Sequence, residues 1–407
     1  MLAATVIVVA LLIAATAWLA RPHQVATLVL HQAGVALGLE IRFSGAAEYR
    51  LRGTPHLMVR DLEARRPGAE RPLLTARRAY LALPWSTLRS RGTDLTVERI
   101  ELDAPHLDLA ALQEWLASRP PGDGARIPVL TRGIRITGGS VEGGDWHLRR
   151  LGVDLPRLHP GRRVSGRVTG ELLAAEIRLP FDLQVLLAEP APDAALGLAG
   201  IATLVTASWS LPMQPVLSAR LHAGDDGYGL DGMRLGMRAR YHAPAQEPLH
   251  FTAGLAAPVR YLDGRVALAR LTLVLRGDGI VPDLRARGRF AWEEGIELEL
   301  DGALQHWPRR WPALPRPLDT VDSPLPFALG YTGAADFSGL AQLRLQHGPA
   351  RLDSRFRLPE VLDWFERLPA GTPVPPLEGH LSLPRLEVAG ARLHGVEVAV
   401  SPEAAEP

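Results

Sequence analysis

Residues 295–302 read GIELELDG and display the pattern that decides the fold of this chain. Ile296, Leu298 and Leu300 alternate with two glutamates and an aspartate, and a glycine stands at each end. Successive residues of a β-strand point to opposite faces, so this stretch predicts a strand with one apolar and one charged face. Strands of this kind are typical of antiparallel sheets, because both faces of a parallel sheet are usually covered.

The same alternation returns along most of the chain after residue 41. Clear examples are residues 95–97, 100–102, 271–275, 341–345 and 396–400. Glycine and proline clusters interrupt these runs at short intervals, as expected between the strands of an antiparallel sheet. We therefore predict a mainly β protein with few helices. The helices are expected at residues 25–35, at 109–118 after the capping residue Asp108, and at 359–368 with Pro359 in the first turn.

Residues 2–20 form a different kind of segment, because they contain no charged side chain. As a helix they would span roughly 28 Å, which matches the core of a bilayer. Trp18 would lie near the membrane surface, where its amphipathic ring is favoured. We therefore predict an uncleaved membrane anchor at residues 1–20, with its apolar surface formed by Leu2, Ile7, Leu11, Leu12 and Trp18.

Two other interpretations of this segment stay open. A cleaved signal peptide would have a basic residue before the apolar run and a cleavage site after it. No basic residue precedes the run, and the candidate site at residues 15–17 falls inside it. A buried helix of a soluble domain is the third interpretation. The charges around the segment do not set its orientation, since Arg21 follows it and nothing basic precedes it.

The composition excludes several classes of function. The 407 residues carry a net charge of +1, so no overall positive field attracts nucleic acid. The chain has no Cys, Lys or Asn, which excludes disulfides, thiolate nucleophiles, Schiff-base lysines and N-glycosylation.

No local motif predicts an enzyme or a metal site. The histidines form no H-E-x-x-H pattern, and no G-x-S-x-G elbow is present. The acidic stretch at residues 225–232 lacks the ligand spacing of a calcium loop, and a hairpin turn explains it better. We therefore expect no catalytic residue, no metal and no cofactor.

The segment that follows the apolar run resembles the opening unit of the AsmA family. The resemblance rests on GTPHLMV at residues 53–59, DLE at 61–63, PLLTA at 72–76, YLAL at 80–83, STL at 86–88 and LTVERIELDAPHLDL at 95–109. It covers roughly residues 1–118. It implies short strands, a polar turn and a strand pair that is broken by a proline and leads into a helix.

The family resemblance also implies a place and a function. Members of this family and their TamB-like and YhdP-like relatives are single-pass inner-membrane proteins of Gram-negative bacteria with their bulk in the periplasm. They are thought to form an elongated, bent, groove-like antiparallel sheet whose apolar face shields lipid acyl chains. We expect four parts in the chain: the anchor at 1–20, an AsmA-like β unit with a juxtamembrane helix at 21–118, a middle β region at 119–305 and a C-terminal β region at 306–407.

The function expected from these observations is the binding or transfer of phospholipid, in support of outer-membrane biogenesis. The partners would be membrane lipids, the inner membrane and other envelope-assembly proteins. One alternative is a structural or assembly factor with closed β-sandwich domains and no lipid cargo. Another is a subunit of a lipid export system like the LptC class, which also joins one membrane span to a β-jellyroll.

Two groups of residues are candidates for contact with lipid. The apolar positions of the alternating strands would line the groove, and these are Leu271, Leu273, Leu275, Ile296, Leu298, Leu300, Leu343 and Leu345. Arginine outnumbers acidic residues between positions 60 and 91, and Arg60, Arg65 and Arg66 could contact anionic head groups. A solvated outer strand face would explain the same arginines. The cluster of Trp307, Arg309, Arg310 and Trp311 suits either a membrane contact or a stiff crossover loop.

Overall fold

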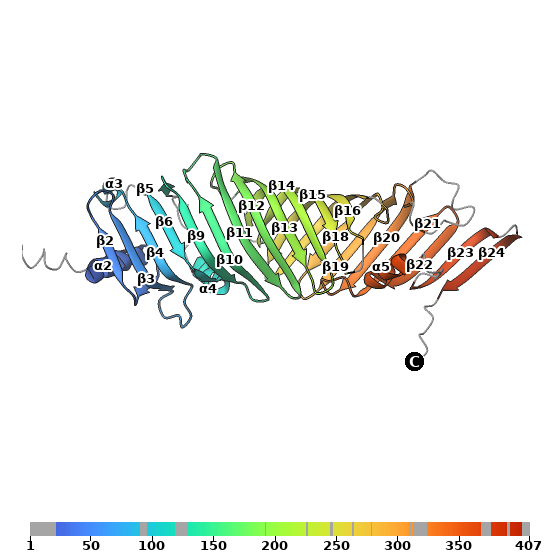
Figure 1. The fold of residues 1–407 in the computed structure, drawn as a ribbon, viewed down its shortest axis with the longest axis horizontal. Coiled ribbons are helices and arrows are strands. Elements are labelled where there is room, and N and C mark those ends of the chain that lie inside the picture. The colour runs from blue at the N-terminus through green and yellow to red at the C-terminus, as the bar shows by residue number, and fades with distance from the viewer. Residues whose placement is uncertain are drawn as a thin grey trace, which may run out of the picture. The chain divides into compact units, whose positions relative to one another are not determined.

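The computed structural model confirms a mainly β protein (Figure 1). It describes residues 22–89, 96–118, 128–191, 193–224, 227–244, 247–262, 264–277, 279–308, 311, 324–367, 376–388 and 391–400. Twenty-two strands belong to one mostly antiparallel sheet, and two more form a small parallel pair. The predicted anchor at residues 1–20 lies outside the described residues. Among the residues that are described, no helix is long and apolar enough to cross a bilayer.

The chain divides into two compact units. The first unit contains residues 1–174 and 180–191, and the second contains residues 175–179 and 192–407. The main division lies between residues 191 and 192, after strand β12 (Ile177–Leu187), whose first residues up to Leu179 belong to the second unit. Each unit has its own apolar core.

In its described residues, the first unit combines three helices with the early strands. The helices are α2 (Pro22–Leu37), α3 (Trp85–Arg89) and α4 (Leu109–Ala117), together with the turn at Asp108 that caps α4. The strands are β1 (Glu40–Phe43), β2 (Ala47–Arg50), β3 (His56–Arg65), β4 (Leu74–Ala82), β5 (Thr96–Val97), β6 (Arg99–Asp103), β7 (His106–Asp108), β8 (Val129–Leu130), β9 (Ile134–Glu142), β10 (Trp146–Leu155) and β11 (Val164–Ala174).

A proline break and a helical crossover shape this unit. β6 and β7 are two halves of one strand, separated by Ala104 and Pro105, and both halves pair with β4. β9 runs parallel to β6 and β7. Parallel neighbours need a long connection, and α4 lies within it. The predicted cap is confirmed, because the Asp108 carboxylate accepts a hydrogen bond from the Ala111 N–H at 3.0 Å.

The second unit is a succession of antiparallel hairpins. Its strands are β13 (Ala195–Val205), β14 (Ser210–Gly224), β15 (Gly227–Tyr241), β16 (Leu249–Leu262), β17 (Arg265–Gly277), β18 (Leu284–Trp292), β19 (Ile296–Leu304), β20 (Leu325–Gly333), β21 (Leu340–His347), β22 (Ala350–Arg357), β23 (Leu377–Val388) and β24 (Ala391–Val400). The helix α5 (Leu358–Arg367) lies within one residue of its predicted position. β14 and β15 pair antiparallel up to Gly224 opposite Gly227, so residues 227–232 of the predicted turn belong to β15, and residues 225–226 lie outside the described residues.

The sheet of the second unit folds over its apolar face. In Figure 1 the strands β14 to β16 pass in front of β18 and β19. The indole N–H of Trp209, in the turn before β14, donates a hydrogen bond to the Asp336 carbonyl at 3.4 Å. Asp336 lies in the loop after β20. Each strand is twisted relative to its neighbour, so the twist adds up across the sheet. Strands such as β14 and β20, six positions apart, can therefore cross at a large angle, and the start of one can contact the end of the other.

Candidate functional site

A continuous row of apolar residues crosses the sheet of the second unit from β13 to β24. Each strand contributes one residue, and each residue is the register partner of the next. The row is Leu198, Leu217, Leu235, Leu255, Leu273, Ala286, Gly302, Phe327, Leu345, Leu352, Leu381 and Val398. With about 4.8 Å between neighbouring strands, its contour length is roughly 53 Å.

All eight groove candidates lie on the same face as this row. Leu273 and Leu345 belong to the row itself. Leu271 and Leu300 face each other through Gly288, and Leu300 continues through Leu329 to Leu343. The apolar face of β17 also carries Leu275, and that of β19 carries Ile296 and Leu298. The period of two therefore groups these side chains as a single surface.

The eight candidates differ in their access to solvent. Leu271, Ile296 and Leu300 are buried by neighbouring protein groups. The other five, Leu273, Leu275, Leu298, Leu343 and Leu345, are half-buried. Buried members can serve only the protein core, whereas half-buried members leave apolar surface for another molecule.

Aromatic side chains border the apolar face of the second unit. Trp307 and Trp311 pack edge to face, with ring centroids 4.8 Å apart, and both lie against the core beneath the row. The Trp311 N–H donates to the Ile280 carbonyl at 2.9 Å, which holds the pair over the loop between β17 and β18. The two flanking arginines, Arg309 and Arg310, lie outside the described residues. Trp307 and Trp311 therefore act at least as part of the core.

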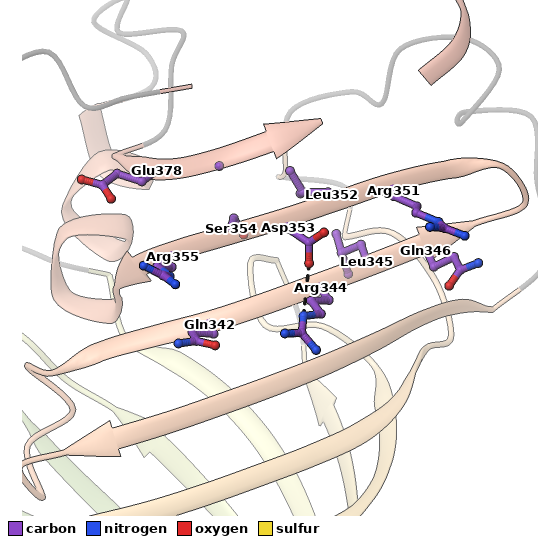
Figure 2. Close-up of a pocket in the computed structure, with 11 residues that line it drawn as sticks. Gln342, Arg344, Leu345, Gln346, Arg351, Leu352, Asp353, Ser354, Arg355 and Glu378 are labelled. Carbon is purple, nitrogen blue, oxygen red and sulfur yellow. Dashed lines mark ion pairs between the residues drawn. The ribbon is translucent and has the colours of Figure 1, made fainter. Parts of the chain in front are cut away.

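The opposite face of the same strands is charged. Arg289 of β18 pairs with Glu299 of β19, and Arg344 of β21 pairs with Asp353 of β22 at 3.2 Å. The polar side of β21 to β23 carries a hollow of about 800 Å³ (Figure 2). Its polar lining comes from Gln342, Arg344, Gln346, Arg351, Asp353, Arg355 and Glu378. Leu345 and Leu352 of the apolar row also belong to the lining, so the hollow is not purely polar.

The first unit carries a second apolar row. It runs through Ala47, Val59, Ala79, Leu102, Ile136, Val153 and Val168, again one residue per strand. The first four of these residues belong to the core that packs against α2. Ile136, Val153 and Val168 are half-buried. The described helices pack mainly on β1, β2, β5, β7 and β22, so the part of the row on β9 to β11 is the less covered part.

The candidate head-group arginines are already engaged with acidic groups in two of three cases. Arg65 pairs with Glu63 on its own strand. Arg66 pairs with Glu114 of α4 at 2.6 Å. Arg60 is exposed on the polar face of β3. The three side chains therefore do not converge on one site.

The described part of the chain contains no group of three or more His, Cys, Asp or Glu residues that could hold a metal ion. His222 and Asp231 do pair, but Asp231 also pairs with Arg260. The Arg260 guanidinium, at 2.7 Å, is the main reason that the pKa of Asp231 lies below its ordinary value. An arginine-bound carboxylate of this kind stabilises neighbouring strands and is not free to ligate a metal.

Several members of the rows were missed by the sequence analysis. Leu198, Leu217, Leu235 and Leu255 stand in alternating stretches, which was the available signal. Their place in a row depends on how the strands pair, and alternation within one strand does not contain that information.

Comparison with protein-family models, with curated proteins and with solved structures finds no match to this chain.

Proposed function

We propose that this protein binds the acyl chains of lipids along its apolar rows while it is tethered to a bacterial inner membrane. The bulk of the chain would lie in the periplasm and would take up or transfer phospholipid in support of outer-membrane biogenesis. The AsmA-like segments quoted above and the uncharged run at residues 2–20 support this location. Envelope-assembly proteins are the expected protein partners.

The observation that carries the proposal is the apolar row, in which the residues other than Ala286 and Phe327 are half-buried. A row of one apolar residue per strand offers an acyl chain a path on which it can lie across the strands. Each Å² of apolar surface removed from water contributes about 25 cal/mol, so a chain lying along several strands would gain several kcal/mol. The lipid head group would stay at the solvent-exposed border of the sheet.

The apolar surface requires no covalent chemistry for this task. Binding needs half-buried aliphatic side chains that shield the acyl chain from water. Release needs only another apolar environment that shields the acyl chain equally well. We therefore propose a passive lipid-binding protein and not an enzyme.

Closed packing in the second unit favours a second candidate function. Leu271, Leu300 and Phe327 are buried in one cluster, with Trp307 and Trp311 against it. If protein groups fill the whole interior, the chain is a structural or assembly factor without lipid cargo. The two candidates differ in one measurable quantity, the amount of lipid that copurifies with the protein.

The decisive experiment is mass spectrometry of the full chain purified in mild detergent. We expect stoichiometric phospholipid on the wild type and a large loss of lipid in Leu273→Glu and Ile136→Glu. The matched controls are Thr272→Glu and Thr137→Glu, which place the same charge on the opposite face of the same strands. These controls should retain their lipid.

A charge beside the core could also unfold the protein, so a second substitution is needed. Leu273→Trp keeps the face apolar and fills space that an acyl chain would occupy. We expect a folded protein, checked by its thermal transition, that carries less lipid. Two results would contradict lipid binding: wild-type protein that carries no lipid, or equal lipid on the Leu273 and Thr272 variants. Either result would favour the structural role.

A further inference from the structure

The helix α2 contains no acidic residue, no lysine and no arginine. Its sequence, PHQVATLVLHQAGVAL, contains no Asp, Glu, Lys or Arg over 16 residues. Surface helices of globular proteins usually carry charged residues on the side that faces water. The outer strand faces of this chain follow that rule, as the pairs Arg289–Glu299 and Arg344–Asp353 show.

One side of α2 belongs to the core of the first unit. Ala26 is fully buried, and Val29 and Leu30 pack against the same cluster of strand residues. This cluster includes Ala47 and Val59, which begin the apolar row of the unit. The helix therefore covers the beginning of that row.

The other side of α2 is exposed and carries aliphatic side chains. Leu28 is 48% exposed and Val35 is 67% exposed. These two residues lie seven positions apart, which places them on the same side of a helix, two turns from each other. The exposed positions between them are His31 and Gln32, which are polar.

The sequence before α2 indicates what covers this face. Residues 2–20 are uncharged and long enough to span a bilayer, and only Arg21 separates them from the first residue of α2. A helix that starts at the membrane surface and exposes aliphatic side chains without charge is suited to the lipid interface. We propose that the Leu28–Val35 face of α2 lies on the surface of the lipid bilayer.

This contact would determine where lipid reaches the protein. An α-helix with its side chains is about 10–12 Å across. With one side of α2 on the bilayer and the other on Ala47 and Val59, the apolar row begins one helix diameter from the membrane. The inference rests on the proposed membrane tether, and it holds whether or not the row carries lipid.

The absence of cysteine in the chain makes a direct test possible. Single cysteines are placed in the full chain at Leu28 and Val35, labelled with bimane, and the protein is reconstituted in nanodiscs that contain doxyl-labelled phospholipid. Matched controls are Val216→Cys, where the wild-type side chain is 62% exposed, and Leu262→Cys, where it is 48% exposed. Thermal transitions confirm that each variant is folded.

We expect the labels at Leu28 and Val35 to be quenched severalfold more than their controls. Equal quenching within each pair, in protein that copurifies with the nanodiscs, would overturn the proposal. Quenching at Leu28 without quenching at Val35 would mean that the helix rises away from the bilayer, and it would overturn the proposal too. Protein that does not copurify with nanodiscs would overturn both the tether and this contact. Lipid bound by the row is measured separately by mass spectrometry, so the two proposals fail independently.

Discussion

Arg78 links two strands on the polar face of the first unit through a pair of carboxylates. Its guanidinium donates to Asp103 at 2.6 Å and to Glu101 at 2.8 Å, and Glu101 also accepts from Arg99. All of these side chains are less than a third exposed. Burial works to raise the pKa of Glu101, but the hydrogen bonds from Arg78 and Arg99 outweigh it and leave this pKa below the ordinary value.

The lowered pKa predicts a pH-dependent contribution of Glu101 to stability. A carboxyl with a depressed folded pKa stabilises the fold above its ordinary value of 4.5, and this stabilisation is lost as pH falls through the folded pKa. We expect Glu101→Gln to cost about 1 kcal/mol at neutral pH. The difference from wild type, measured by urea unfolding, should shrink as pH falls below 4.5.

Glu114→Gln is a control for Glu101, because Glu114 forms its ion pair with Arg66 at 61% exposure. An ion pair in solvent contributes little, so this variant should unfold close to wild type at every pH. An equal loss of stability in Glu101→Gln at neutral and acidic pH would contradict the role given to the charged form of Glu101.

At the level of elements, the helix α4 depends on its cap. None of its side chains is buried, and its ties to the unit are single contacts, such as the Trp115 N–H to the Leu37 carbonyl at 3.0 Å. Asp108 satisfies the N–H of Ala111 at the start of the helix. We expect Asp108→Ala to cost about 1 kcal/mol, and Asp108→Asn to cost much less.

Hydrogen exchange is the measurement for this prediction. Faster exchange should be confined to residues 109–117, because little else packs on the helix. Exchange in Asp108→Ala that matches wild type across α4 would show that the cap does not limit the stability of the helix.

The strands were easier to predict than their pairing. The octapeptide at 295–302 was predicted as a strand with an apolar and a charged face, and β19 confirms it. The register was not predictable, because a slip of one residue would exchange the two faces and nothing within a strand sets it. In β17, an irregularity between Leu268 and Leu271 brings both onto the apolar face although they are three residues apart. Simple alternation places them on opposite faces.

The candidate site was predictable to a similar extent. The sequence placed the eight candidates, seven leucines and one isoleucine, on one kind of face, and they do share a face. Burial could not be predicted, because it depends on what folds over the sheet. The hydrogen bond between Trp209 and Asp336 joins positions that are 127 residues apart in the chain. No local pattern contains a contact over such a separation.

At the level of the whole molecule, each unit contains a core of its own. Val59, in the first unit, is 2% exposed and packs beneath α2. Leu300, in the second unit, is 5% exposed and packs among Leu271, Ala286 and Phe327. Because the cores are separate, a destabilising substitution in one unit should lower the stability mainly of that unit.

Leu300→Ala tests this independence. Removing a buried leucine side chain costs about 2–5 kcal/mol, so the second unit should become markedly less stable. In native-state hydrogen exchange of the full chain, protection should fall across β17 to β20 while β3 and β4 keep their wild-type rates. Val59→Ala should produce the reverse pattern, with loss in β3 and β4 only. If either substitution lowered protection equally in both sets of strands, the two cores would unfold as one cooperative unit, because independent units exchange through separate openings.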